Sequence, residues 1–166
     1  VYNLEKILSI YPNAKIIHII RDGRAVLSSN LKTNKLMIEK NQKPIFPEDE
    51  YISYYYWKNA IKFTKKLQKN NNYLEISYRN LLLNPEKKLK QICKLINIDF
   101  NKKMLKFSTI NKKTNLVPKN RKYYHKNTFE KIKKKKIYAW KNELELNKRH
   151  RFELIANKYL KKKIIK

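Results

Sequence analysis

Residues 15–29 read KIIHIIRDGRAVLSS, and this stretch decides the fold class of the chain. The apolar, β-branched run that ends at Ile20 predicts a buried strand that is covered on both faces. The residues that follow predict a sharp turn around Gly23 and then a helix over residues 24–33. Arg21 therefore comes just beyond the carboxyl end of a strand, where open α/β sheets bind their ligands.

The residue types at this turn suit a phosphate. The guanidinium of Arg21 offers two parallel N–H donors with a fixed positive charge, which matches the oxygens of a phosphate group. The helix that follows adds free backbone N–H groups and the positive end of its dipole. We therefore expect an anion-binding site where this strand ends.

Patterns in the rest of the chain predict alternating strands and helices. Helical spacing of apolar residues predicts helices over residues 4–11, 49–69, 86–97, 101–107, 131–146 and 149–163, and alternation predicts a strand over residues 73–77. Proline and polar residues predict loops over residues 34–48 and 108–127, and a turn over residues 78–85. This order favours an α/β fold with a mostly parallel sheet.

Length and composition fit one folded domain. The chain has 166 residues, of which 42% are hydrophobic, enough for a single core. No apolar run reaches the roughly 18 residues of a membrane span, and no signal peptide opens the sequence, so we expect a cytoplasmic protein.

The single cysteine, Cys93, excludes a disulfide framework and predicts a buried thiol. Because the chain begins at Val1 and not at Met, we also expect the C-terminal portion of a longer protein.

The formal charge of +28 raises the possibility of a nucleic-acid partner. The excess is mostly lysine spread over nearly every segment, whereas specific nucleic-acid binders usually gather arginine and aromatic residues on one face. We therefore expect only non-specific binding of nucleic acid, which salt weakens.

Residues 11–29, YPNAKIIHIIRDGRAVLSS, resemble the second cofactor-binding motif of the sulfotransferase family. These enzymes use 3′-phosphoadenosine 5′-phosphosulfate (PAPS) as the sulfuryl donor. The resemblance implies that Arg21 and Ser29 hold the 3′-phosphate of the nucleotide. Ser28 competes with Ser29 for this role, and the family spacing favours Ser29.

Two further blocks carry the same resemblance. Residues 73–100 are similar to the strand–Tyr–helix segment of the family, and the tyrosine near the nucleotide falls on Tyr78, although Arg79 and Asn80 stand where Glu-Asp is common. Residues 137–144, IYAWKNEL, resemble a Trp-containing segment ahead of which some members carry basic residues that close over the 3′-phosphate. This implies a role for the lysine run at residues 133–136, and we assign it to Lys134.

The resemblance implies a three-layer α/β fold with a mostly parallel sheet, of the P-loop-NTPase-like sulfotransferase type. Family members carry a Gly-containing phosphate loop after the first strand, and Gly23 is the sole glycine here. We therefore expect residues 1–166 to be one incomplete domain that lacks this loop. The family branch suggested by RDGRA is that of bacterial and tyrosylprotein sulfotransferases.

The implied function is transfer of a sulfuryl group from PAPS to a hydroxyl or amine acceptor, without a metal. This chain would supply the 3′-phosphate half of the site and would be inactive alone, and no catalytic base is assigned. Simpler alternatives stay open for single residues: Arg21 pairs with Asp22, Ser29 is an ordinary helix residue, and Tyr78 is a buried structural tyrosine. For the whole chain the alternatives are a basic polyanion-binding module without catalysis and a kinase-like P-loop relative.

Overall fold

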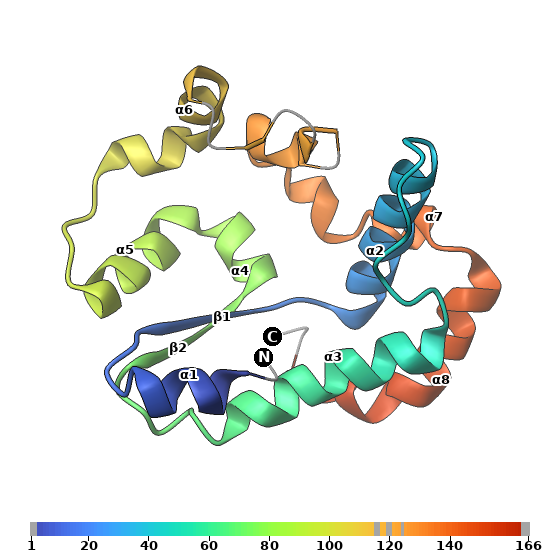
Figure 1. The fold of residues 1–166 in the computed structure, drawn as a ribbon, viewed down its shortest axis with the longest axis horizontal. Coiled ribbons are helices and arrows are strands. Elements are labelled where there is room, and N and C mark those ends of the chain that lie inside the picture. The colour runs from blue at the N-terminus through green and yellow to red at the C-terminus, as the bar shows by residue number, and fades with distance from the viewer. Residues whose placement is uncertain (1–2, 115–116, 119–120, 124, 164–166) are drawn as a thin grey trace.

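The computed structural model describes residues 3–114, 117–118, 121–123 and 125–163 (Figure 1). Two short strands pair at the centre, and helices account for most of the other ordered segments. The elements in chain order are α1 (Leu4–Ile10), β1 (Ile16–Ile20), α2 (Gly23–Ile38), α3 (Glu50–Lys65), β2 (Tyr73–Ser77), α4 (Tyr78–Leu83), α5 (Pro85–Ile96), η1 (Lys102–Lys106), α6 (Phe107–Lys113), η3 (Lys126–Phe129), η4 (Lys134–Ile137), α7 (Trp140–Glu143) and α8 (Leu146–Lys163).

The parallel register of the two strands brings their carboxyl ends together. Ile20 of β1 is paired with Ser77 of β2, so the next residues, Arg21 and Tyr78, leave the sheet at the same edge. This confirms the predicted α/β class with a parallel sheet, which has two strands in the part of the chain that the structure describes. The wider sheet of a P-loop-like, three-layer fold stays a prediction.

The prediction that β1 is covered on both faces is wrong. Ile17 and Ile19 are 38% and 48% exposed, whereas Ile20, on the other face, is 7% exposed. Side chains alternate between the two faces of a strand. Helix α5 packs against β2, whereas Ile17 and Ile19 of β1 stay exposed.

The core lies on the face of β1 that carries Ile20. There α3 and α8 run side by side (Figure 1), and Ile20 and Leu27 pack with Trp57 and Phe152 in one buried cluster. The α2 helix enters this cluster through Gly23. A Cβ atom at that position would lie 2.6 Å from Cζ of Phe152 and 2.9 Å from Cδ2 of Trp57. The predicted turn lies between Ile20 and Gly23. Since the φ angle of Gly23 is not positive, close packing is the reason for a glycine at this position.

Helix α2 is longer than predicted, and the following loop is correspondingly shorter. The helix runs to Ile38, so the first residues of the predicted loop at 34–48 are helical. Asn34 is fully buried, donates to the carbonyl oxygen of Phe46, and accepts hydrogen bonds from the N–H groups of Ile45 and Phe46. Asn34 in α2 thus fixes the loop that follows the helix by hydrogen bonds to its backbone at residues 45–46.

Three other predicted boundaries need correction. The predicted turn at residues 78–85 contains helix α4, and Ser77 Oγ caps it by accepting from the Asn80 N–H. The predicted basic loop at residues 108–127 begins inside α6, although five residues of this range lie outside the described part. The predicted helix at residues 131–146 is broken into η4 and α7.

A polar cluster of three side chains lies around Tyr73 on the sheet. The hydroxyl of Tyr73 lies 3.0 Å from Nδ1 of His18 and donates to Oε2 of Glu75 at 3.2 Å. Burial raises the pKa of Tyr73 to about 12, and the charge of Glu75 adds to this shift while the Thr64 hydroxyl opposes it.

We expect this raised pKa to lower the unfolding free energy between pH 10 and 12. Over that range the unfolded chain releases the Tyr73 proton while the folded chain keeps it, so rising pH favours unfolding. Denaturant titrations at a series of pH values should show the loss in the wild type and a smaller loss in Tyr73→Phe. The exposed Tyr51 supplies the control, because Tyr51→Phe should retain the full wild-type slope.

Candidate functional site

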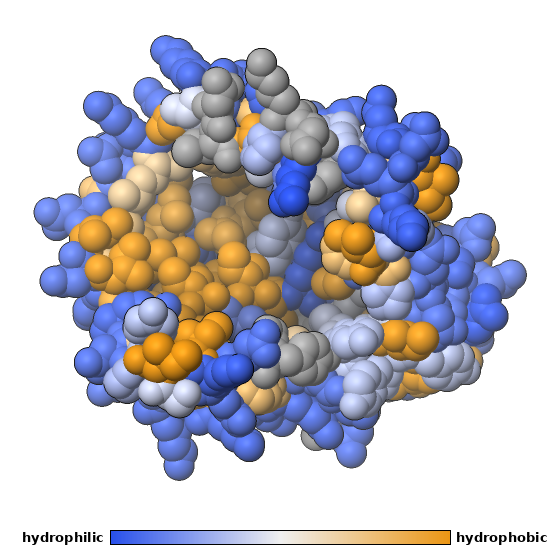
Figure 2. All heavy atoms as spheres, viewed as in Figure 1, coloured by the Kyte–Doolittle hydropathy of each residue, from blue (hydrophilic) through white to orange (hydrophobic). Residues whose placement is uncertain are grey.

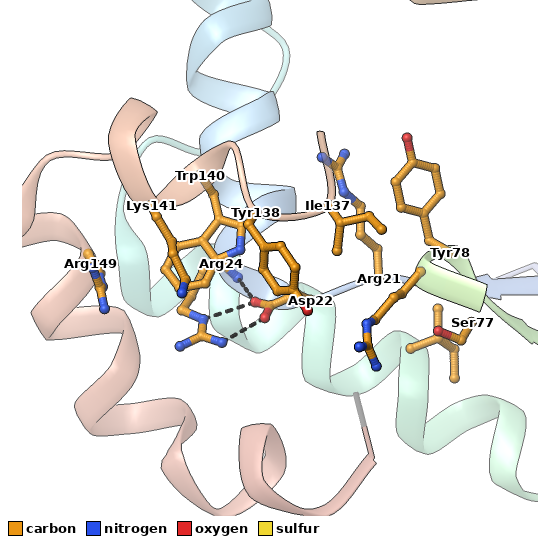
Figure 3. Close-up of a pocket in the computed structure, with 12 residues that line it drawn as sticks. Arg21, Asp22, Arg24, Ser77, Tyr78, Ile137, Tyr138, Trp140, Lys141 and Arg149 are labelled. Atoms are coloured by element: carbon orange, nitrogen blue, oxygen red, sulfur yellow. Dashed lines mark hydrogen bonds and ion pairs between the residues drawn. The ribbon is translucent and has the colours of Figure 1, made fainter. Parts of the chain in front are cut away.

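A pocket of about 300 Å³ opens beyond the carboxyl ends of β1 and β2 (Figure 3). This volume is at the lower end of the range for small-molecule sites. The β1–α2 turn, the start of α4, the segment around α7 and the first turns of α8 contribute the walls, whose basic residues outnumber the single acidic one. The lining residues are Ile20, Arg21, Asp22, Arg24, Ser77, Tyr78, Arg79, Ile137, Tyr138, Trp140, Lys141 and Arg149.

Arg21 lies at one end of this pocket beside Tyr78 (Figure 3). Its guanidinium carbon lies 4.8 Å from the centroid of the Tyr78 ring. The backbone is held by Trp57, whose indole N–H donates to the Arg21 carbonyl oxygen at 3.0 Å. In the described part of the chain no ion pair joins Arg21 to a carboxylate, so the alternative in which it pairs with Asp22 is wrong.

Asp22 pairs instead with Arg24. Its carboxylate accepts from the Arg24 backbone N–H at 2.9 Å and from Nε and one terminal nitrogen of the Arg24 guanidinium at 3.0 and 2.7 Å. The same carboxylate therefore caps α2 and fixes the Arg24 side chain. This arrangement leaves the charge of Arg21 available to the pocket.

A second pocket of about 390 Å³ shares Tyr78 with the first. Its floor is apolar, and Figure 2 shows these side chains gathered in a hollow over α4 and α5. Lysines stand at its rim, and two of them, Lys133 and Lys136, form ion pairs with Glu130. The apolar lining residues are Leu81, Leu82, Pro85, Leu89, Met104, Leu105, Phe107 and Ile132.

The structure brings together two of the four predicted site residues. Arg21 and Tyr78 line the same pocket. Ser29 lies one turn and a half into α2 and lines neither pocket, and its carbonyl oxygen accepts from the Thr33 hydroxyl. Lys134 is exposed at the start of η4 and also lines neither pocket, although Lys133 and Lys136 do reach the second. The assignment of all four residues to a nucleotide stays a prediction.

Ser28, the alternative to Ser29 for the predicted phosphate contact, bonds to another helix. Ser28 is 5% exposed, and its hydroxyl donates to Oε2 of Glu143 on α7 at 3.4 Å. This contact joins α2 to α7. It does not involve either pocket.

Sequence reasoning missed several pocket residues. Arg79 is a departure from the family pattern, Lys141 lies in the Trp-containing segment at residues 137–144 but was assigned no role, and Arg149 lies in no motif. Ser77 could have been found, since a serine followed three residues later by a polar residue at the end of a strand is a helix-cap pattern. The missed basic residues extend the positive lining beyond Arg21.

The described residues contain no group of three or more His, Cys, Asp or Glu side chains that could hold a metal ion. No helix among them is long and apolar enough to cross a membrane.

Comparisons with known proteins agree on one family. The model of the family described as "Sulfotransferase family" matches residues 1–102. A Caenorhabditis briggsae protein whose name describes it as a candidate protein-tyrosine sulfotransferase is 28% identical over 106 residues, which are 61% of this chain and 35% of that protein. The chain thus spans about a third of the length of this relative. No solved structure matches the chain at a comparable level of significance.

Proposed function

This chain belongs to the sulfotransferase family, and we propose that its pocket at Arg21 and Tyr78 binds the 3′-phosphate end of PAPS. In this proposal the complete enzyme transfers a sulfuryl group to a hydroxyl or amine acceptor. The observation that carries it is the Arg21 guanidinium, which lies beside Tyr78 in a basic pocket without a carboxylate partner among the described residues.

The two adjoining pockets fit the two chemical parts of a nucleotide. Arg21 and the other basic residues of the first pocket suit a phosphate dianion. The apolar floor of the second pocket suits a planar base, with Tyr78 between the two parts. Ser29 and Lys134 would need to approach the phosphate from outside the pocket to take their predicted roles.

The residues of this chain would bind and align the donor. In sulfuryl transfer the acceptor oxygen or nitrogen attacks sulfur, the bond from sulfur to the 5′-phosphate oxygen breaks, and adenosine 3′,5′-bisphosphate leaves. The acceptor proton goes to a base that we do not assign. Arg21, at the distant 3′-phosphate, would contribute binding energy and alignment. The Gly-containing phosphate loop that relatives use for the 5′-phosphosulfate has no counterpart in residues 1–166, so we propose that this chain alone does not turn over.

The name of the Caenorhabditis briggsae relative suggests the acceptor. We propose that the hydroxyl is that of a tyrosine, because that relative is named for protein-tyrosine sulfation. An amine or another hydroxyl stays the alternative.

Calorimetric titration with two nucleotides of similar charge tests the donor site. Adenosine 3′,5′-bisphosphate and ADP each carry two phosphate groups on adenosine, but only the first has a 3′-phosphate. We expect the 3′,5′-bisphosphate to bind at least about 10-fold more tightly, since one charge-assisted contact contributes about 1.5–3 kcal/mol.

Equal affinities would contradict the proposal. They would favour the alternative of a polyanion-binding module, in which affinity follows total charge and falls steeply with salt for any anion. Repeating both titrations at higher salt separates the two functions, because only a specific 3′-phosphate contact keeps the ratio of affinities above one.

A further inference from the structure

Trp140, on the pocket wall, has two guanidinium groups close to its ring. The Arg24 guanidinium carbon lies 4.0 Å from the centroid of the Trp140 ring, and that of Arg149 lies 5.0 Å from it. The tryptophan is 3% exposed. It stands at the start of α7, a single turn of four residues whose N-terminal cap makes no side-chain hydrogen bond. So short a helix has little stability of its own, and its position depends on side-chain contacts.

One carboxylate oxygen serves both guanidinium groups. Oε1 of Glu153, on α8, accepts from a terminal nitrogen of Arg24 at 2.7 Å and from Nε of Arg149 at 3.1 Å. The carboxylate of Asp22 accepts hydrogen bonds from Nε and the other terminal nitrogen of Arg24. Glu153 thus connects the start of α2 to α8 beside the tryptophan.

This network is more enclosed than an ordinary surface ion pair. The side chains of Arg24 and Asp22 are 14% and 17% exposed, and those of Glu153 and Arg149 are 30% and 31% exposed. Burial alone would raise the pKa of the Glu153 carboxyl, but hydrogen bonds from Arg24 and Arg149 outweigh it and hold the pKa below its usual range. Without the Glu153 charge, Arg149 would lose the carboxylate that it binds here, and Arg24 would keep Asp22 alone.

We propose that Glu153 is a positioning residue, which acts through Arg24 and Arg149 to hold Trp140 as a wall of the nucleotide pocket. Glu153 does not line that pocket itself. Its effect on ligand binding rests on the proposed function, whereas its effect on Trp140 does not.

Tryptophan fluorescence of the ligand-free protein tests the position of Trp140 directly. The protein has two tryptophans, so the signal of Trp140 is the difference between the wild type and Trp140→Phe. In Glu153→Gln we expect this signal to shift to longer wavelength and to be quenched by acrylamide at least twofold more efficiently, with an unchanged far-UV circular dichroism spectrum. Glu86→Gln is the matched control, because it removes a paired carboxylate on α5, and it should leave the signal unchanged.

Ligand binding provides the second measurement. We expect Glu153→Gln to weaken the binding of adenosine 3′,5′-bisphosphate about 10-fold. In a Trp140→Phe background the same substitution should change the affinity less than twofold, because the group that Glu153 positions is then altered already. A purely structural role would weaken binding equally in both backgrounds.

An unshifted Trp140 signal in folded Glu153→Gln would overturn the proposal. If that variant does not fold, Arg149→Gln removes one of the two contacts and should still produce part of the shift, and no shift there would overturn the proposal equally. If the wild type does not bind the bisphosphate, the proposed function fails, while the fluorescence measurement still decides whether Glu153 positions Trp140.

Discussion

Replacing Arg21 with Ala is expected to weaken binding of adenosine 3′,5′-bisphosphate by about 30-fold, which corresponds to about 2 kcal/mol. The Arg21 guanidinium is the charge in the pocket that lies beside Tyr78 and has no carboxylate partner among the described residues. Removing it takes away a charge-assisted contact without breaking an ion pair of the fold. Calorimetric titration of the wild type and the variant measures the loss.

Controls for this variant separate a specific site from general attraction. Lys35→Ala removes an exposed positive charge from α2 and should leave the affinity for the bisphosphate within about twofold, consistent with the small effect of exposed charges. Binding of bulk duplex DNA should barely change in Arg21→Ala, because one charge among 41 lysines and arginines is lost. An equal loss of affinity for DNA and nucleotide would support the polyanion-binding module instead.

Replacing Gly23 with Ala is expected to lower the free energy of unfolding by about 2 kcal/mol, within the range for overpacking a core. The added Cβ would approach ring atoms of Phe152 and Trp57 to 2.6–2.9 Å, and Phe152 is fully buried. The gain in helix propensity from Gly to Ala, up to about 1 kcal/mol, offsets part of this strain. Denaturant unfolding followed by circular dichroism measures the difference.

A second substitution tests the cause of that loss. Phe152→Leu removes the outer ring atoms that the new Cβ would meet, whereas the approach to Trp57 remains, so Gly23→Ala should cost less in a Phe152→Leu background than in the wild type. The two effects are then strongly non-additive, as expected for residues in direct contact. Additive losses would mean that Gly23 does not act through its contact with Phe152.

The sequence predicted the centre of the site because local patterns determine it. The β-branched run before Arg21 and the alternating residues before Tyr78 both read as strands, and parallel pairing then places the residues that follow them side by side. The parallel direction of the two strands is the single contact between distant segments that this placement of Arg21 and Tyr78 requires.

The rest of the site depends on contacts between distant segments. Trp140 and Arg149 line the pocket beside Arg24, and Arg24 of α2 binds Glu153 of α8, 129 residues away in the chain. Neither periodicity nor spacing encodes such a pairing. The length of α2 was missed for a similar reason, since Asn34 reads as a loop residue until its bonds to Phe46 are known.

The covering of β1 was mispredicted because a continuous apolar run does not say which neighbours are present. The run fits a strand in the middle of a sheet, but the described residues supply one partner strand, β2, and leave Ile17 and Ile19 exposed. An apolar run thus predicts that a strand can be buried on both faces, but it does not show which segments of the chain cover it.

The backbone edge of β1 that β2 leaves unpaired bears on how molecules of this protein would meet in solution. The edge of β1 away from β2 pairs with no strand in the described part of the chain, and an unpaired apolar edge is a template for a strand of another copy. The net charge of +28 keeps copies apart at low ionic strength, and salt screens that repulsion. We therefore expect that raising the salt concentration weakens the attraction for anionic ligands and, at the same time, favours self-association through β1.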